Sequence, residues 1–285
     1  MNPSEIKSKA KEYLQSNWWI LFLISAFVLI LSSLFSYIPP YTYQNNFNID
    51  GSIINVTRNS LFGNYIWLFL LFGVFQLSQA FIFLKTIKGE KPIFNEIFKG
   101  FKYFIKADLI TIFITLLSAL WLLLAAAPLA LTMLSSGNFT NGLNTSSAQS
   151  IILVIAFFAS LFLLGLAIYK IIRYTQSYYI LSENPEMSAW NCIRKSVELM
   201  HGNFWRLVRL TLSFIGWLLL SLLIVIILSV AFDHYFGQSF ASNEIVSVIY
   251  LLPFAFLIVY FSQSLAVFYT TLKPKIMSSA DDLRQ

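Results

Sequence analysis

Residues Leu109–Leu131 read LITIFITLLSALWLLLAAAPLAL, a run of 23 residues without a charged side chain. About 20 apolar residues in a helix cross a hydrocarbon core of about 30 Å. Backbone N–H and C=O groups find no water there, so a single spanning segment satisfies them as a helix. The run is continuous rather than alternating, which favours a helix over a strand. This stretch therefore predicts a membrane-spanning helix.

Five more apolar runs predict membrane-spanning helices for the same reasons, and none contains Asp, Glu, Lys, Arg or His. They are Trp18–Ile38, Tyr65–Leu84, Ile151–Tyr169, Leu210–Phe232 and Ile245–Phe268. Hydrophobic residues make up 58% of the 285 residues and charged residues 11%, with a mean hydropathy of +0.71. A soluble domain carries about 25% charge because its surface must be solvated. We predict an all-α membrane protein with six transmembrane helices in a single polytopic domain over residues 1–285.

The basic residues indicate the orientation. Of the 19 Lys and Arg, 18 lie before the first run, in the second and fourth connections, or in the tail, and Arg58 is the exception. Short connections rich in Lys and Arg stay in the cytoplasm. We therefore expect a multi-pass protein of a bacterial-type cytoplasmic membrane with both termini inside. Anionic lipid headgroups at the cytoplasmic face are the expected partners of these cations, rather than nucleic acid.

The alternative for the first run is a cleaved signal peptide, since Lys7, Lys9 and Lys11 precede it. The apolar stretch is long for that role, however, and Pro39-Pro40 follows it where a small-residue cleavage site would stand.

A weak threefold repeat runs through the chain. Each predicted hairpin carries a Gln between two small residues near the end of its second helix, at Gln79, Gln176 and Gln263. The spacings are 97 and 87 residues. Fixed spacing of this kind indicates a repeat architecture. We predict three helical hairpins in units of roughly 1–90, 91–184 and 185–275, followed by a cytoplasmic tail, 276–285.

Basic amphipathic stretches precede the first helix of each predicted hairpin. Their apolar residues recur at helical spacing, and Lys and Arg occupy the other faces, a pattern typical of interfacial helices. The alternative is that they merely extend the spanning helices. Pro3-Ser4, Pro92, and Pro185 with Ser188 supply start signals. The apolar sets are Ile6, Ala10, Tyr13 and Leu14; Ile97, Phe98, Phe101, Phe104 and Ile105; and Trp190, Ile193, Val197 and Met200.

The three glutamines are the first candidate polar interior. An amide in hydrocarbon is costly unless it is paired, so these side chains should face the inside of the bundle. If the repeat holds, they lie at similar depth and could form a ring. Such a ring would be either a constriction or ligand site, or polar contacts that hold the helices together. The second role is the commoner one.

Lys170 and Arg173 complete the candidate set, because they precede Gln176 on a shared helical face. Hydropathy ends the fourth run at Tyr169 and leaves both cations at the cytoplasmic interface. The repeat register instead draws them into the membrane. Long cationic side chains near a helix end reach the interface without a special partner, which favours the first interpretation.

Motifs for catalysis, cofactors or metals are not found in the sequence. Glu198 and His201 form one Glu-x-x-His, whereas a carboxylate-bridged metal site needs two such pairs and two more Glu. A single cysteine, Cys192, is expected to be a packing residue. We expect no enzyme, no cofactor and no metal site.

The stretch Tyr178–Trp217, YYILSENPEMSAWNCIRKSVELMHGNFWRLVRLTLSFIGW, carries Asn184-Pro185, Gly202 and Ser213–Trp217 in a characteristic order. It resembles the uncharacterised Gram-positive membrane-protein family known as domain of unknown function 975. The resemblance implies a multi-pass membrane protein with no catalytic residues to carry over. A distant likeness to membrane domains attached to glycerophosphodiester phosphodiesterases implies a lipid-related setting.

Two functions follow as hypotheses. The first is a non-enzymatic accessory, envelope-stress or immunity-type protein that acts through lipid or protein contacts. The alternative is a transporter or exporter of a small amphiphile or peptide, with the glutamines, Lys170 and Arg173 lining its path. A polar cavity that reaches Gln79, Gln176 and Gln263 would favour transport.

Overall fold

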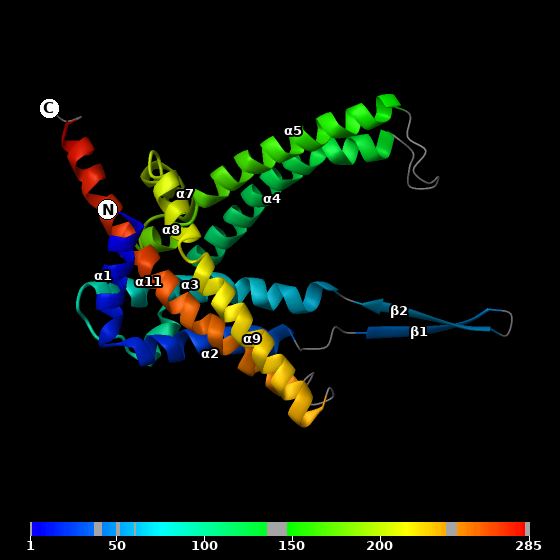
Figure 1. Ribbon diagram of the computed structural model, residues 1–285, viewed down its shortest axis with the longest axis horizontal. Coiled ribbons are helices and arrows are strands. Elements are labelled where there is room, and N and C mark those ends of the chain that lie inside the picture. The colour runs from blue at the N-terminus through cyan, green and yellow to red at the C-terminus, as the bar shows by residue number, and fades with distance from the viewer. Residues whose placement is uncertain are drawn as a thin grey trace. The chain divides into compact units, whose positions relative to one another are not determined.

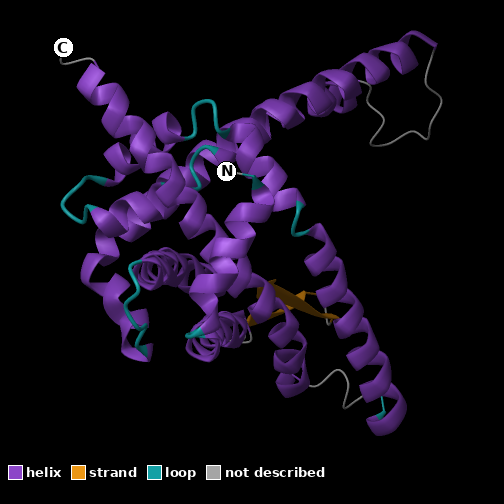
Figure 2. Ribbon diagram, turned by 60° about the vertical axis from the view of Figure 1, so that its left-hand side comes forward, coloured by secondary structure: helices purple, strands orange, loops and turns teal. Residues whose placement is uncertain are grey.

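The computed structural model describes the backbone of residues 2–36, 42–49, 52–59, 61–135, 147–237 and 244–282, and the regular elements among these residues are helices apart from one two-stranded hairpin (Figures 1 and 2). The elements are α1 (Pro3–Gln15), α2 (Trp18–Ser36), β1 (Thr42–Ile49), β2 (Ser52–Asn59), α3 (Leu61–Ile87), the 3₁₀ helix η1 (Phe94–Tyr103), α4 (Phe104–Ser135), α5 (Ser147–Ile172), α6 (Ser177–Glu183), α7 (Ala189–Leu199), α8 (Phe204–Leu212), α9 (Ile215–Phe236) and α11 (Glu244–Asp282).

Several helical segments are long and apolar enough to cross a membrane. Among the described residues they number four: Phe94–Leu134, Ser150–Glu183, Phe204–Tyr235 and Val248–Lys273. A fifth is reached if Pro3–Gln15 and Trp18–Leu31, which meet at a bend of 98°, count as one broken span. The helical, multi-pass character is thus confirmed, whereas the count of six and the threefold repeat stay predictions.

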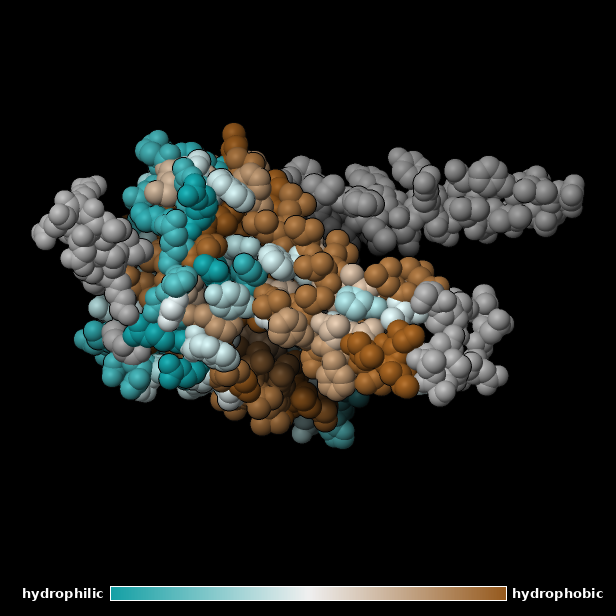
Figure 3. All heavy atoms as spheres, turned by 90° about the horizontal axis from the view of Figure 1, so that it is seen from above, coloured by the Kyte–Doolittle hydropathy of each residue, from teal (hydrophilic) through white to brown (hydrophobic). Residues whose placement is uncertain are grey.

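These helices expose many large apolar side chains on their surface. On α5, Ile151, Phe158 and Phe162 are 61%, 62% and 69% exposed. Soluble monomers rarely expose apolar patches larger than a few hundred Å². Hydrophobic side chains spread over much of the visible face in Figure 3. Lipid is the solvent that such a surface requires.

Contacts divide the chain into two compact units. The first comprises Met1–Asp108 and Trp205–Gln285, and the second Leu109–Phe204. In the first unit α11 is central, because it packs against α1, α2, α3 and α9. Ala255, Ala266 and Ser264 on α11 are fully buried. Small residues of this kind let helix backbones approach closely.

The predicted fifth run, Leu210–Phe232, lies within the candidate span Phe204–Tyr235. A two-residue turn divides this span, because α8 ends at Leu212 and α9 begins at Ile215. The Ser213 hydroxyl donates to the carbonyl of Leu210 at 2.6 Å. Ser side chains compete in this way with the helical backbone ladder. The interruption leaves the Ser213 carbonyl to accept a hydrogen bond from the Lys7 ammonium at 2.8 Å.

Each amphipathic stretch forms a helical element, and the middle one, η1, runs directly into α4 within the candidate span Phe94–Leu134. α1 begins with Pro3 in its first turn and buries Ile6, Ala10 and Leu14, as expected. α7 is capped by Ser188, whose hydroxyl accepts from the Asn191 N–H at 3.4 Å. The middle stretch is a 3₁₀ helix rather than an α-helix.

The buried face of the middle stretch also differs from the expected one. η1 buries Ile97 and Gly100, while Phe98 and Phe101 are 48% and 41% exposed. Gly100 fits because a Cβ there would collide with the Val74 carbonyl and the Ser78 hydroxyl of α3.

The first outer connection contains structure that we did not predict. β1 and β2 pair antiparallel within Tyr41–Asn64, with Ile49 opposite Ser52. This register leaves the two residues Asp50 and Gly51 between the strands. Asp-Gly is a strong sequence signal for a two-residue hairpin, although the neighbouring apolar runs dominate the sequence pattern.

Candidate functional site

Gln263 lies in the interior of the first unit. Its side chain on α11 is fully buried. The amide oxygen accepts a hydrogen bond from the Thr86 hydroxyl of α3 at 2.9 Å, and the amide nitrogen donates to the Phe83 carbonyl at 3.5 Å. These contacts join α11 to α3, which is the role of polar contacts between helices.

Gln79 occupies the same helix as Thr86 and is 7% exposed. Residues three or four positions apart share a helix face, so Gln79, Phe83 and Thr86 form one row along α3. The neighbouring Ser78 hydroxyl donates to the Val74 carbonyl at 3.0 Å and accepts from the Gly100 N–H at 2.9 Å. Ser78 thereby fixes η1 against α3.

Gln176 belongs to the second unit and has a different setting. It is fully buried in the turn between α5 and α6. Its backbone N–H donates to the Ser196 hydroxyl at 3.2 Å, and that hydroxyl donates to the Arg173 carbonyl at 2.7 Å. Ser196 therefore ties α7 to the turn. The amide oxygen of Gln176 is buried without a hydrogen-bond donor among the described residues.

The predicted ring of glutamines is thus brought together only in part. Gln79 and Gln263 share the first unit, whereas Gln176 belongs to the second. Gln79 and Gln263 stand within long helices, but Gln176 stands at a helix break. The ring stays a prediction.

Lys170 and Arg173 each have partners within the second unit. The Lys170 ammonium lies 5.2 Å from the centre of the Trp121 ring. The Arg173 guanidinium lies 5.4 Å from the Tyr169 ring centre and donates to the Val197 carbonyl of α7 at 3.0 Å. Cations over aromatic faces and on free carbonyls need no acidic partner. These contacts attach Arg173 to the basic helix α7.

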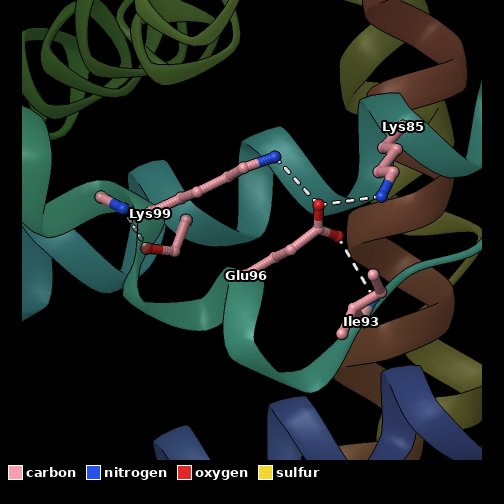
Figure 4. Close-up of polar contacts among 6 residues, drawn as sticks. Lys85, Ile93, Glu96 and Lys99 are labelled. Carbon is pink, nitrogen blue, oxygen red and sulfur yellow. Dashed lines mark hydrogen bonds and ion pairs between the residues drawn. The ribbon is translucent and has the colours of Figure 1, made fainter.

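A charged cluster that sequence reasoning missed lies at the junction of α3 and η1 (Figure 4). One carboxylate oxygen of Glu96 accepts from Lys85 at 2.8 Å and from Lys99 at 2.9 Å. The other accepts from the Ile93 N–H at 3.1 Å. The Glu96 side chain is 11% exposed, so its charge is compensated where water is scarce. The i to i+3 spacing of Glu96 and Lys99 was the available sequence signal.

A second missed feature is a cavity of about 610 Å³ among α1, α2, α9 and α11. Apolar side chains such as Leu220, Ile224 and Phe256 form most of its wall. Lys11, Gln15 and Ser221 also line it. None of the three predicted glutamines lines this cavity. Sequence reasoning could not find it, because its walls come from both ends of the chain.

Among the described residues, no group of three or more His, Cys, Asp and Glu is arranged to hold a metal ion. Cys192 is fully buried, as expected of a packing residue.

The long apolar helices with their exposed hydrophobic surface define a multi-pass α-helical membrane protein. The whole chain except its last ten residues, 1–275, matches the family described as "Protein of unknown function (DUF975)". The chain belongs to this family, as the resemblance in Tyr178–Trp217 indicated. Comparison with curated proteins and with solved structures finds no match.

Proposed function

We propose that this protein is a non-enzymatic accessory factor of the cytoplasmic membrane, with six spans and both termini inside, which acts through lipid or protein contacts. The observation that carries the proposal is the way in which basic amphipathic elements are attached to the spanning helices. Each buries one face against a span and leaves cations exposed. Exposed examples are Lys9 on α1, Lys102 on η1 and Arg194 on α7.

The attachments follow one order, which supports the proposed repeat. η1 packs against α3, the helix of Gln79. α7 packs against α6, which begins directly after Gln176. α1 packs against α11, the helix of Gln263. η1 and α7 thus each pack against the glutamine-bearing segment that precedes them in the chain. α1 packs against α11, the last of the three glutamine-bearing segments.

The hydrogen bonds of Gln263 favour an accessory role over a transporter. A residue that lines a transport path needs access to solute, whereas Gln263 is fully buried and bonded to Thr86 and Phe83. Three exposed basic faces instead suit the anionic headgroups of the inner leaflet, where each nearby Lys or Arg contributes about 1 kcal/mol.

The test is deletion of the gene followed by measurement of sensitivity to membrane-active peptides and of lipid composition. The neutralised variant Lys102→Gln/Arg194→Gln should fail to restore the wild-type response. The charge-conserving control Lys102→Arg/Arg194→Lys should restore it. Full restoration by the neutralised variant, together with loss of uptake or export of an amphiphile in the deletion strain, would favour the transporter instead.

A further inference from the structure

The cavity in the first unit combines an apolar wall with a cationic rim. α9 contributes Leu220 and Ile224, and α11 contributes Phe256 and Leu257. α1 contributes Lys11, which is exposed and is the charged residue of the lining. Within the described part of the chain, the ion pairs involve Glu96 and leave Lys11 out. An apolar interior beside an uncompensated cation is complementary to an anionic amphiphile.

Aromatic side chains mark where this rim lies. Trp18 stacks on Phe256, with ring centres 5.7 Å apart, and Trp217 meets Tyr260 edge to face at 6.0 Å. All four residues line the cavity. Trp and Tyr concentrate at the boundary between hydrocarbon and headgroups. The cavity therefore opens at the depth where a phospholipid carries its phosphate.

A second lysine on α1, Lys7, makes structural contacts beside the cavity. The Lys7 ammonium donates to the Ser213 carbonyl at 2.8 Å and lies 4.5 Å from the centre of the Phe214 ring. The Lys7 carbonyl accepts from the Tyr260 hydroxyl at 3.3 Å. Lys7 thus joins α1 to the turn between α8 and α9 and to α11. Lys11, one turn further along the same face, is left available for a ligand.

We propose that this cavity binds one anionic glycerophospholipid from the bilayer, with an acyl chain against α9 and α11 and the phosphate at Lys11 and Gln15. This inference rests on the proposed function and names a site for its lipid contacts. The volume of about 610 Å³ falls within the range of small-molecule pockets, about 300–1,000 Å³. Basic pockets between membrane helices on the cytoplasmic side are known to bind anionic headgroups.

Charge variants test the headgroup contact. The full chain, purified in detergent, is titrated with dioleoyl phosphatidylglycerol or dioleoyl phosphatidylcholine, and bound lipid is counted by native mass spectrometry. Lys11→Gln should weaken phosphatidylglycerol binding about fivefold, the equivalent of one lysine near a headgroup, and leave phosphatidylcholine binding unchanged. The control Lys88→Gln removes the same charge from an exposed position of the first unit outside the lining and should bind as the wild type does. Equal losses in both variants would indicate unspecific surface attraction and overturn the site.

Size variants test the acyl contact. Leu220→Trp fills the cavity and should reduce the binding of both lipids, whereas Leu219→Trp, exposed on the same helix outside the lining, should not. Unchanged binding to Leu220→Trp would overturn the proposal. The proposal would also be overturned if light scattering showed a dimer of the wild-type protein that Leu220→Trp dissociates. A second copy of the chain would then occupy the cavity. If Lys11→Gln binds normally while the Lys102→Gln/Arg194→Gln strain still shows its defect, the cavity proposal alone fails.

Discussion

Gln263 and Thr86 are hydrogen-bonded at 2.9 Å across 177 positions of sequence. The contact joins α11 to α3, and both side chains are buried within the first unit. The Thr86 hydroxyl also lies 2.8 Å from the Phe83 carbonyl in its own helix. Its single proton therefore has two acceptors, so loss of Gln263 leaves Thr86 satisfied.

A double-mutant cycle measures this contact. Gln263→Leu and Thr86→Val each preserve side-chain volume approximately and remove one partner. Hydrogen bonds between membrane helices average about 0.6 kcal/mol and reach about 1.7 kcal/mol. We expect a coupling energy in that range from unfolding of the detergent-solubilised protein. Strictly additive losses would mean that the two side chains do not interact.

Gly100 tests the close approach of η1 to α3. Gly100→Ala should lower the free energy of unfolding by about 1–3 kcal/mol, the usual cost of overpacking, because the new Cβ meets the Val74 carbonyl and the Ser78 hydroxyl. Gly165→Ala is the matched control, since a Cβ at Gly165 meets nothing within 4 Å. The control should be neutral or stabilising, as alanine is the better helix former. Equal effects in thermal unfolding would contradict the packing described.

Ser196 tests the link between α7 and the turn before α6. Ser196→Ala leaves the Gln176 N–H and the Arg173 carbonyl without their partner, at about 1–3 kcal/mol for each group left unsatisfied. Hydrogen exchange of the Gln176 amide should become faster, which reports directly on the opened turn. Ser8→Ala, at an exposed position of α1, should change stability by less than about 0.5 kcal/mol. Unchanged exchange at Gln176 would refute the link.

Glu96→Gln tests the charged cluster at the start of η1. The amide keeps the shape and can still accept from Ile93, but it leaves the partly buried Lys85 without a counter-charge. We expect a loss of about 1–2 kcal/mol. The exposed Glu90 supplies the control Glu90→Gln, which should stay within about 0.5 kcal/mol. A neutral Glu96→Gln would show that the cluster does not hold η1 on α3.

Hydropathy alone located the long helices that the structure describes. A helix that crosses the hydrocarbon core needs a long apolar run, and such runs stand out in the sequence. Hydropathy could not locate the turn at Ser213 and Phe214, because the apolar run continues across the two residues that separate α8 from α9. Partners such as Lys7 and Tyr260 lie 253 positions apart, and no local pattern in a single sequence predicts such pairs. The hairpin in Thr42–Asn59 was predictable from Asp50-Gly51, whereas the cavity was not.

The proposed topology depends on the side of the membrane on which the basic connections lie. In a Cys192→Ala background, Lys91→Cys places a thiol at an exposed position between α3 and η1, and Asn141→Cys places one in the third connection. Intact cells are treated with a membrane-impermeant maleimide. We predict labelling of Asn141→Cys in intact cells and of Lys91→Cys only after lysis. Labelling of Lys91→Cys in intact cells would contradict the orientation.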